Sequence, residues 1–264
     1  MTLRSEKPAE DSLFFSGAWQ SKDGYLTRSD LAKLDGYKLI ESEIVPKAGK
    51  AQLGVIPLKS LINLLGLQSH GDGLVLECTD RWESFMEISY IEEKNPLLLL
   101  YYNNESPKDG NWPWFGGNIE PLEPFYVFID GQLDSYPESP KFGMISATQM
   151  SGIRAVNTEE RYAPYFAPPM DQLSKIARSG RQIFLQRCST CHLGPGSVGG
   201  NVAERPFIIL QTHAQYNEAY LRSVIVDPKT VYPDTIMPRH KDFGDTELDA
   251  ITAYLKETAV LKTP

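Results

Sequence analysis

The chain has 264 residues, of which 41% are hydrophobic and 23% charged, a composition typical of soluble globular proteins. Its length favours two domains over one. The net charge is −8, with 11 Lys+Arg and 10 Asp+Glu in residues 171–264 against 15 and 24 in residues 1–170. The sequence has no basic stripe and no run of about eighteen apolar residues, so we expect neither a nucleic-acid partner nor a membrane span.

Strand and turn signals dominate the first part of the chain. A short helix is predicted over residues 26–34, with Ser29 or Asp30 near its start, and a stronger one over residues 58–65, followed by Gly66. Apolar runs bounded by turn residues predict strands over residues 13–18, 73–78, 95–102, 125–129 and 150–156. These elements predict an α+β domain with a mixed sheet.

A proline-rich stretch divides the chain. Residues 156–170 contain three prolines and show no clear period. Because proline lacks an amide donor and fixes its own dihedral, this stretch is predicted to be a linker. Helical patterns dominate after it. We therefore predict an α+β domain at residues 1–155, the linker, and an all-α domain at residues 171–264.

The strongest chemical signal is Cys-Ser-Thr-Cys-His at residues 188–192. Two thiols at this spacing, Cys188 and Cys191, can add to the two vinyl groups of one porphyrin. The next residue, His192, then lies under the iron as its proximal ligand, so the motif predicts one covalent haem c. A zinc site would need a second ligand pair, and no cysteine follows Cys191. A thioredoxin-like motif should open a helix, whereas this one ends a helical run.

The surrounding pattern resembles class I cytochrome c over about residues 172–260. A helix is predicted over residues 172–187, in which Gly180 and Phe184 precede Cys188 at a Gly-x-x-x-Phe-x-x-x-Cys spacing. A last helix is predicted after a capping box at residues 246–249. The small glycine would let the last helix cross the first closely, with Tyr254 filling the crossing.

The resemblance implies a sixth iron ligand downstream. Met237 lies between prolines, 45 residues after His192, and looks like the methionine ligand of that family, whose soft thioether raises the potential. His240 is the alternative ligand. Pro206 would place its carbonyl on the proximal imidazole, although Pro195 lies nearer in the sequence. The expected cofactor-binding residues are Cys188, Cys191, His192, Met237, Pro206 and Tyr254, with His192 and Met237 on the iron.

The first domain resembles the sulfite oxidase-type molybdopterin domain over about residues 12–156. The resemblance rests on Gly-Val-x-x-Leu-x-x-Leu-x-x-Leu-Leu-Gly at residues 54–66 and on three later segments in the same order. That family binds molybdenum through a cysteine that precedes this helix, and residues 37–50 contain none. Cys78 follows the helix instead. It is therefore expected to be a buried structural residue, and molybdopterin is not expected.

Two loops of the first domain are candidate functional surfaces. Asp80, Arg81 and Trp82 follow a predicted strand and form either a functional loop or a turn with a packed tryptophan. Residues 111–117 crowd three aromatic side chains beside two glycines. That composition suits either a partner-docking loop or an internal plug.

Together these features predict a mono-haem protein that transfers single electrons, has no catalytic residue, and acts in the periplasm or otherwise outside the cytoplasm. The first domain would dock a redox partner protein or serve as an assembly module. The alternative is a haem–molybdenum oxidoreductase in which Cys78 binds the metal. Residues 1–11 lack the apolar core of a signal peptide, and we expect that an export leader preceded them.

Overall fold

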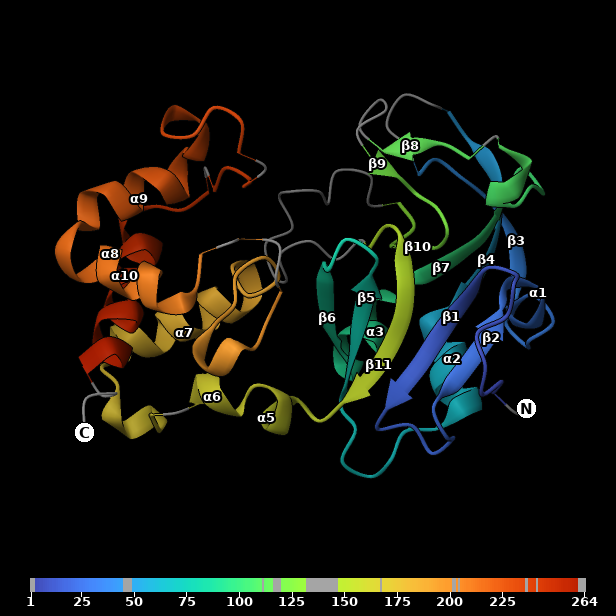
Figure 1. Ribbon diagram of the computed structural model, residues 1–264, viewed down its shortest axis with the longest axis horizontal. Coiled ribbons are helices and arrows are strands. Elements are labelled where there is room, and N and C mark those ends of the chain that lie inside the picture. Colours follow the sequence, from blue (N-terminus) through green and yellow to red (C-terminus); the bar gives the residue numbers. More distant parts are fainter. Residues whose placement is uncertain are drawn as a thin grey trace. The chain divides into compact units, whose positions relative to one another are not determined.

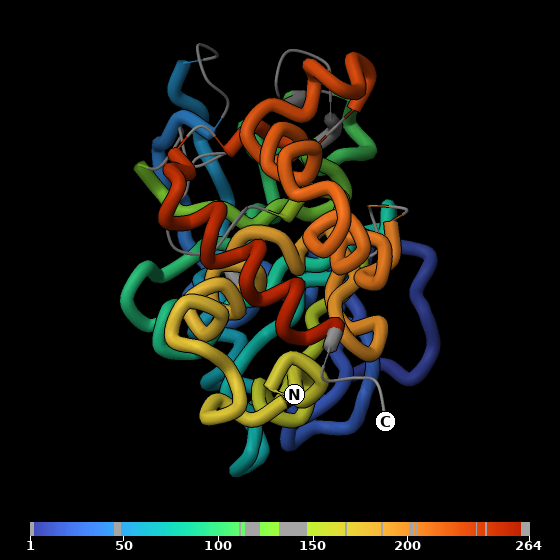
Figure 2. The backbone as a smooth tube through the Cα atoms, turned by 90° about the vertical axis from the view of Figure 1, so that its left-hand side faces the viewer, coloured from blue at the N-terminus to red at the C-terminus, as the bar shows by residue number. Residues whose placement is uncertain are grey.

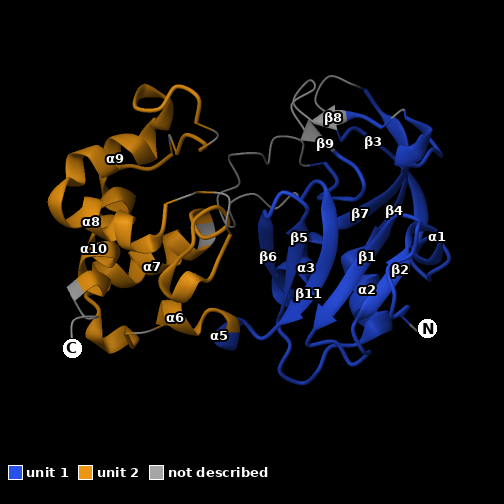
Figure 3. Ribbon diagram, viewed as in Figure 1, with its two compact units in different colours: residues 1–136, 144–160 blue, residues 137–143, 161–264 orange. Residues whose placement is uncertain are grey.

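The described part of the chain forms two compact units, which Figure 3 colours blue and orange. Unit 1 contains the described residues up to 160, and unit 2 those from 161 onward. Unit 1 holds the sheets and unit 2 is helical, so the predicted α+β class with a helical second part is confirmed (Figure 1). The computed structural model describes residues 3–44, 49–110, 112–115, 120–131, 147–166, 168–200, 203, 205–235, 237–240 and 242–260.

The strands of unit 1 are β1 (Ser12–Gly17), β2 (Gly24–Thr27), β3 (Lys38–Ser42), β4 (Ala51–Pro57), β5 (Gly73–Cys78), β6 (Glu83–Glu87), β7 (Leu97–Tyr102), β8 (Trp114–Phe115), β9 (Glu120–Pro121), β10 (Tyr126–Phe128) and β11 (Met150–Val156). One sheet has the order β2-β1-β11-β5-β6 and is mixed, because β1 runs parallel to β11 and the other neighbours are antiparallel. A second, antiparallel sheet has the order β10-β7-β4-β3, and β8 pairs with β9.

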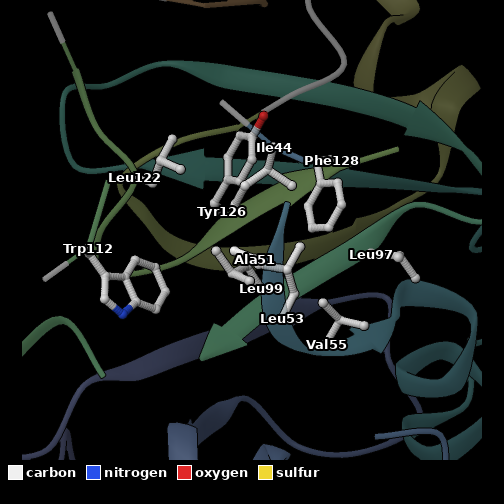
Figure 4. Packing of buried hydrophobic residues seen from close by; sticks show 10 residues of the cluster. All are labelled: Ile44, Ala51, Leu53, Val55, Leu97, Leu99, Trp112, Leu122, Tyr126 and Phe128. Carbon is white, nitrogen blue, oxygen red and sulfur yellow. The ribbon is translucent and has the colours of Figure 1, made fainter. Parts of the chain in front are cut away.

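The core in Figure 4 lies on one face of the second sheet. Successive side chains of a strand point to opposite faces, so Leu53 and Val55 of β4 share a face, as do Leu97 and Leu99 of β7. The whole run from Leu97 to Leu100 is buried, so both faces of β7 are covered. The other members of the cluster are Ile44, Ala51, Trp112, Leu122, Tyr126 and Phe128.

The helices of unit 1 are short: α1 (Arg28–Leu31), α2 (Leu58–Leu65), α3 (Ile88–Lys94) and the 3-10 turn η1 (Pro107–Asp109). Helix α2 has the predicted bounds and ends at Gly66, whose φ is +65°. The helix predicted over residues 26–34 is wrong in extent, because β2 continues to Thr27. The Thr27 hydroxyl accepts a hydrogen bond from the Asp30 amide at 3.1 Å, and the Asp30 carboxylate accepts one from the Thr27 amide at 3.3 Å. This capping box starts the helix at Arg28.

Short helical elements occupy the proline-rich stretch. They are α5 (Thr158–Arg161), α6 (Ala163–Phe166) and η2 (Met170–Gln172). The helices that follow are α7 (Lys175–Arg187), η3 (Pro195–Ser197), α8 (Phe207–Tyr216), α9 (Glu218–Val226), η4 (Pro228–Thr230) and α10 (Asp245–Val260). Within the described residues no helix is both long and apolar enough to cross a membrane.

Helices α7 and α10 cross closely, as the sequence predicts, and Figure 2 shows α10 as an unbroken red helix. A Cβ atom on Gly180 would overlap the carbonyl oxygen of Ala250 and would lie 2.9 Å from the Cβ atom of Tyr254. The predicted cap of α10 is shifted. The helix begins at Asp245, and the Gly244 amide donates to the Glu247 carboxylate at 3.0 Å.

Candidate haem site

The Cys-Ser-Thr-Cys-His motif forms one tight turn at the end of α7. The amides of Cys191 and His192 both donate to the carbonyl oxygen of Cys188, at 3.1 and 2.8 Å. Both cysteines are free thiols. Burial raises the pKa of each thiol to about 12, with the charge of Cys191 adding to the effect at Cys188. The turn thus presents two protonated thiols and one imidazole from five consecutive residues.

His192 is held in the form that binds a metal. Burial, and then the positive charges of His240 and Arg205, lower its pKa to about 4, so the imidazole is neutral near pH 7. Its Nδ1 atom is buried and has no hydrogen-bond partner among the described residues. Two thiols beside a neutral imidazole with a buried, unpartnered nitrogen fit the attachment and ligation of a haem.

Pro206 lies at the start of α8. Its carbonyl oxygen accepts a hydrogen bond from the Ile209 amide at 2.9 Å, within the first turn of that helix. The His192 Nδ1 atom is not bonded to it here. The proposed bond from the imidazole to Pro206 therefore stays a prediction.

A glycine-rich loop, which contains Gly194, Gly196, Gly199 and Gly200, packs on the backbone of the motif. The Gly200 amide donates to the Ser189 carbonyl oxygen at 2.6 Å, and the Ala203 amide donates to the Cys191 carbonyl oxygen at 2.9 Å. A side chain at Gly200 would overlap the carbonyl oxygen of Thr190. The backbone of the loop can therefore lie directly against the turn, and its hydrogen bonds hold the backbone of the motif in place.

Tyr165 anchors the proline-rich stretch to this loop, a contact that the sequence analysis missed. The side chain is fully buried, and its hydroxyl donates to the Val198 carbonyl oxygen at 2.9 Å. The hydroxyl occupies the space that a side chain at Gly194 would fill. A tyrosine within a proline-rich segment followed by a glycine-rich loop was the available signal, but neither segment alone specifies the pairing.

Four aromatic rings form an apolar wall one helical turn before the motif. Phe184 of α7 lies at the centre, with ring centroids 5.4 Å from Phe207, 5.9 Å from Tyr254 and 6.0 Å from Tyr165. All four side chains are buried. The carbonyl oxygen of Phe184 accepts hydrogen bonds from the Cys188 and Ser189 amides, both at 2.9 Å, so the backbone of α7 connects the wall directly to the motif.

Both candidates for the sixth ligand lie in one segment, residues 237–240. Met237 is half-buried. His240 is buried, stacks on Phe243 at 4.9 Å, and its Nδ1 atom has no partner within the described part of the chain. A positive charge on His240 contributes to the lowered pKa of His192, so this segment lies near the histidine of the motif. His213 instead packs on Tyr220, with ring centroids 4.8 Å apart.

The candidate residues of unit 1 lie in a sheet ladder, in a turn and in the core. Cys78 is 7% exposed and pairs with Met150 in the β5–β11 ladder. The Asp80 carboxylate accepts a hydrogen bond from the Trp82 amide at 3.0 Å, which forms the turn between β5 and β6. Trp112 is buried, and its indole donates to the Glu105 carbonyl oxygen at 2.9 Å, so it is an internal plug. Within the predicted 111–117 loop, residues 111, 116 and 117 lie outside the described residues.

Comparison with known proteins bears mainly on unit 2. Residues 175–255 match the family described as cytochrome c oxidase, cbb3-type, subunit III. A cytochrome c oxidase subunit 2 of Alkalihalophilus pseudofirmus is 29% identical over 94 residues. That alignment covers 33% of this chain and 27% of the relative, so this chain spans much less than the length of the protein it matches.

Among solved structures, the sulfane dehydrogenase SoxCD of Paracoccus pantotrophus aligns with 60% of this chain and 42% of its own chain. The sequence identity is 12% and the TM-score is 0.37. The match over residues 175–255, together with the motif turn, makes the C-terminal part of this chain a cytochrome c domain, the type of domain that carries haem c and transfers electrons.

Proposed function

We propose that the protein is a mono-haem c-type cytochrome that transfers single electrons in the periplasm or another extracytoplasmic compartment. The observation that carries the proposal is the single turn that joins two free thiols to a buried, neutral imidazole. Cys188 and Cys191 would each add an S–H group across one vinyl group, forming a C–S bond without an external oxidant. His192 would be the proximal ligand and Met237 the sixth ligand.

A bound haem would supply one-electron exchange between ferric and ferrous iron. The chain's own residues prepare the site for it. The glycine-rich loop holds the backbone of the motif turn, and His192 stays unprotonated. The aromatic wall around Phe184 would exclude water from one side of the haem site. The local dielectric constant would then stay low, which strengthens electrostatic interactions at the site.

For unit 1 we propose a docking or assembly role without a metal cofactor. The order of α2, β5 and β7 supports the resemblance to a sulfite oxidase-type domain, whereas the only cysteine in residues 1–170 is Cys78, which lies within a sheet ladder. Residues 1–170 carry the excess of acidic side chains. That charge suits a basic redox partner protein, since complementary charge speeds association.

The test is the metal and haem content of the full chain, exported in a host that makes both haem c and molybdopterin. We expect one iron per chain, haem that stays attached on a denaturing gel, and no molybdenum. The Cys188→Ser, Cys191→Ser double variant should lose covalent haem, and the Cys78→Ser control should keep it. Stoichiometric molybdenum that disappears in Cys78→Ser would instead make the chain a haem–molybdenum oxidoreductase.

A further inference from the structure

Arg181 of α7 is a buried cation that forms no ion pair with any carboxylate of the described residues. The residue is 1% exposed. One terminal nitrogen, Nη2, donates to the Pro168 carbonyl oxygen at 2.6 Å. The Nε and Nη1 atoms are buried and have no hydrogen-bond partner within the described residues. Across the same residues no Asp or Glu forms an ion pair with it. Three other arginines of unit 2, Arg187, Arg222 and Arg239, each face a carboxylate.

The side chain nevertheless stays charged. Burial lowers its pKa from the ordinary value, and the neighbouring Tyr254 opposes that change. A guanidinium starts from a pKa above about 12, so it keeps its proton at neutral pH. A lone buried charge is normally unfavourable for folding. The Pro168 carbonyl oxygen and the Phe166 ring, whose centroid lies 6.0 Å from the guanidinium carbon, both contact this charge, and neither neutralises it.

Arg181 lies on the same side of α7 as the cysteine motif. It precedes Cys188 by seven residues, or two helical turns, which is about 10 Å along the helix axis. Phe184 lies between them in the helix, three residues after Arg181 and four before Cys188, and its buried ring packs on Tyr254. Because the intervening groups are apolar and buried, solvent screens the charge only weakly.

We propose that Arg181 tunes the reduction potential of the haem, raising it by stabilising the ferrous state. This inference rests on the proposed function, because it requires a haem at Cys188, Cys191 and His192. A haem bound there would lose one unit of positive charge on accepting one electron from a donor, and the fixed positive charge of Arg181 would favour that reduced state. For two unit charges separated by about 12 Å, with an effective dielectric constant of about 20, the interaction would change the reduction equilibrium constant by roughly tenfold.

The experiment is a redox titration of the haem-loaded full chain, with dithionite as reductant and ferricyanide as oxidant. Arg181→Met removes the charge and keeps most of the side-chain length. We expect its reduction equilibrium constant to fall by roughly tenfold, equivalent to about 59 mV for one electron. Lys175→Met removes an exposed charge from the same helix and should leave the potential unchanged. The shift in Arg181→Met should persist at high ionic strength, since the charge is buried.

Arg181→Lys separates charge from shape. A buried ammonium loses its proton more readily than a guanidinium, so its potential should match the wild type at low pH and fall below it as the pH rises. The pH dependence of the Arg181→Lys potential also tests the inference if Arg181→Met does not fold. A potential equal to the wild type in Arg181→Met, or a pH profile of Arg181→Lys parallel to the wild type, would overturn the inference. Wild-type protein without covalent haem would overturn the proposed function instead, and haem content measured first distinguishes the two.

Discussion

The hydroxyl of Tyr165 donates a hydrogen bond to the carbonyl oxygen of Val198, 2.9 Å away, and so ties the proline-rich stretch to the loop that follows His192. The same ring packs on Phe184, one turn before Cys188. Tyr165, within the stretch predicted to be a linker, is therefore part of the packing of the cytochrome c domain. A fragment that begins at residue 171 would lack this contact.

Tyr165→Phe removes only the hydroxyl. The Val198 carbonyl oxygen still accepts a hydrogen bond from the Gly194 amide, so we expect a loss of about 1 kcal/mol in the free energy of unfolding. Tyr165→Ala also empties a buried ring site and should cost about 3–5 kcal/mol. Urea unfolding followed through haem absorbance measures both changes. Tyr216→Phe, at a residue 83% exposed, is the matched control and should change nothing.

Gly180→Ala should destabilise the cytochrome c domain even though alanine is the better helix former by about 1 kcal/mol. The new methyl group would overlap the carbonyl oxygen of Ala250, and relieving that overlap should cost about 1–3 kcal/mol. Thermal unfolding followed through haem absorbance gives the net change. Gln182→Ala, on the exposed side of the same helix, should be neutral or slightly stabilising. A more stable Gly180→Ala protein would contradict the close crossing.

Elements with a strong local period could be predicted from the sequence. Helix α2 has leucines at 58, 61 and 65 that share one face, and the pattern alone gives its bounds. The Gly180–Tyr254 crossing also follows from small and large residues at set positions. Strand β6 was missed because Glu83–Glu87 has only two buried residues, and its pairing with β5 is a tertiary effect.

The burial of Arg181 and of Tyr165 could not be predicted for a related reason. A charged residue in an amphipathic helix is normally assigned to the solvent side. Here the Pro168 carbonyl oxygen, thirteen residues earlier, covers the guanidinium. Tyr165 needs the Val198 carbonyl oxygen, thirty-three residues later. Both partners are backbone atoms, which leave no trace in side-chain patterns.

Arg28→Ala should strongly destabilise unit 1. The Arg28 guanidinium is buried and donates to the carbonyl oxygens of Leu100 and Pro124. It also pairs with Asp11 at 3.4 Å. Truncation leaves these groups without their donor, which should lower the free energy of unfolding by about 3–5 kcal/mol. Tryptophan fluorescence during urea unfolding measures the loss. Arg4→Ala, at a side chain 55% exposed that pairs with Asp30, should cost less than about 1 kcal/mol.

The haem-free chain should lose stability in mild acid. His192 and His240 both have a pKa of about 4 in the folded protein, chiefly because of burial, against about 6.5 when unfolded. The unfolded chain therefore binds more protons between these values, and the free energy of unfolding rises with pH there. The contribution is complete above about pH 6.5 and is lost as the pH falls towards 4.

Urea unfolding of the Cys188→Ser, Cys191→Ser double variant between pH 7.5 and 4.5 tests this dependence. Adding His192→Gln and His240→Phe to that variant should flatten the profile, whereas adding His213→Gln should not. An unchanged slope after both imidazoles are removed would assign the acid sensitivity to other groups.

Met237→Ala should change the ligation of the iron, if Met237 is the sixth ligand. We expect the loss of the long-wavelength charge-transfer band of methionine-bound ferric haem and a lower reduction potential, because thioether sulfur favours ferrous iron. His240→Ala is the matched variant three residues away and should keep the band. The opposite result, a band absent from the wild type and a spectrum altered only in His240→Ala, would make His240 the ligand. Its buried ring nitrogen Nδ1, which has no hydrogen-bond partner among the residues that the structure describes, lies in the same segment.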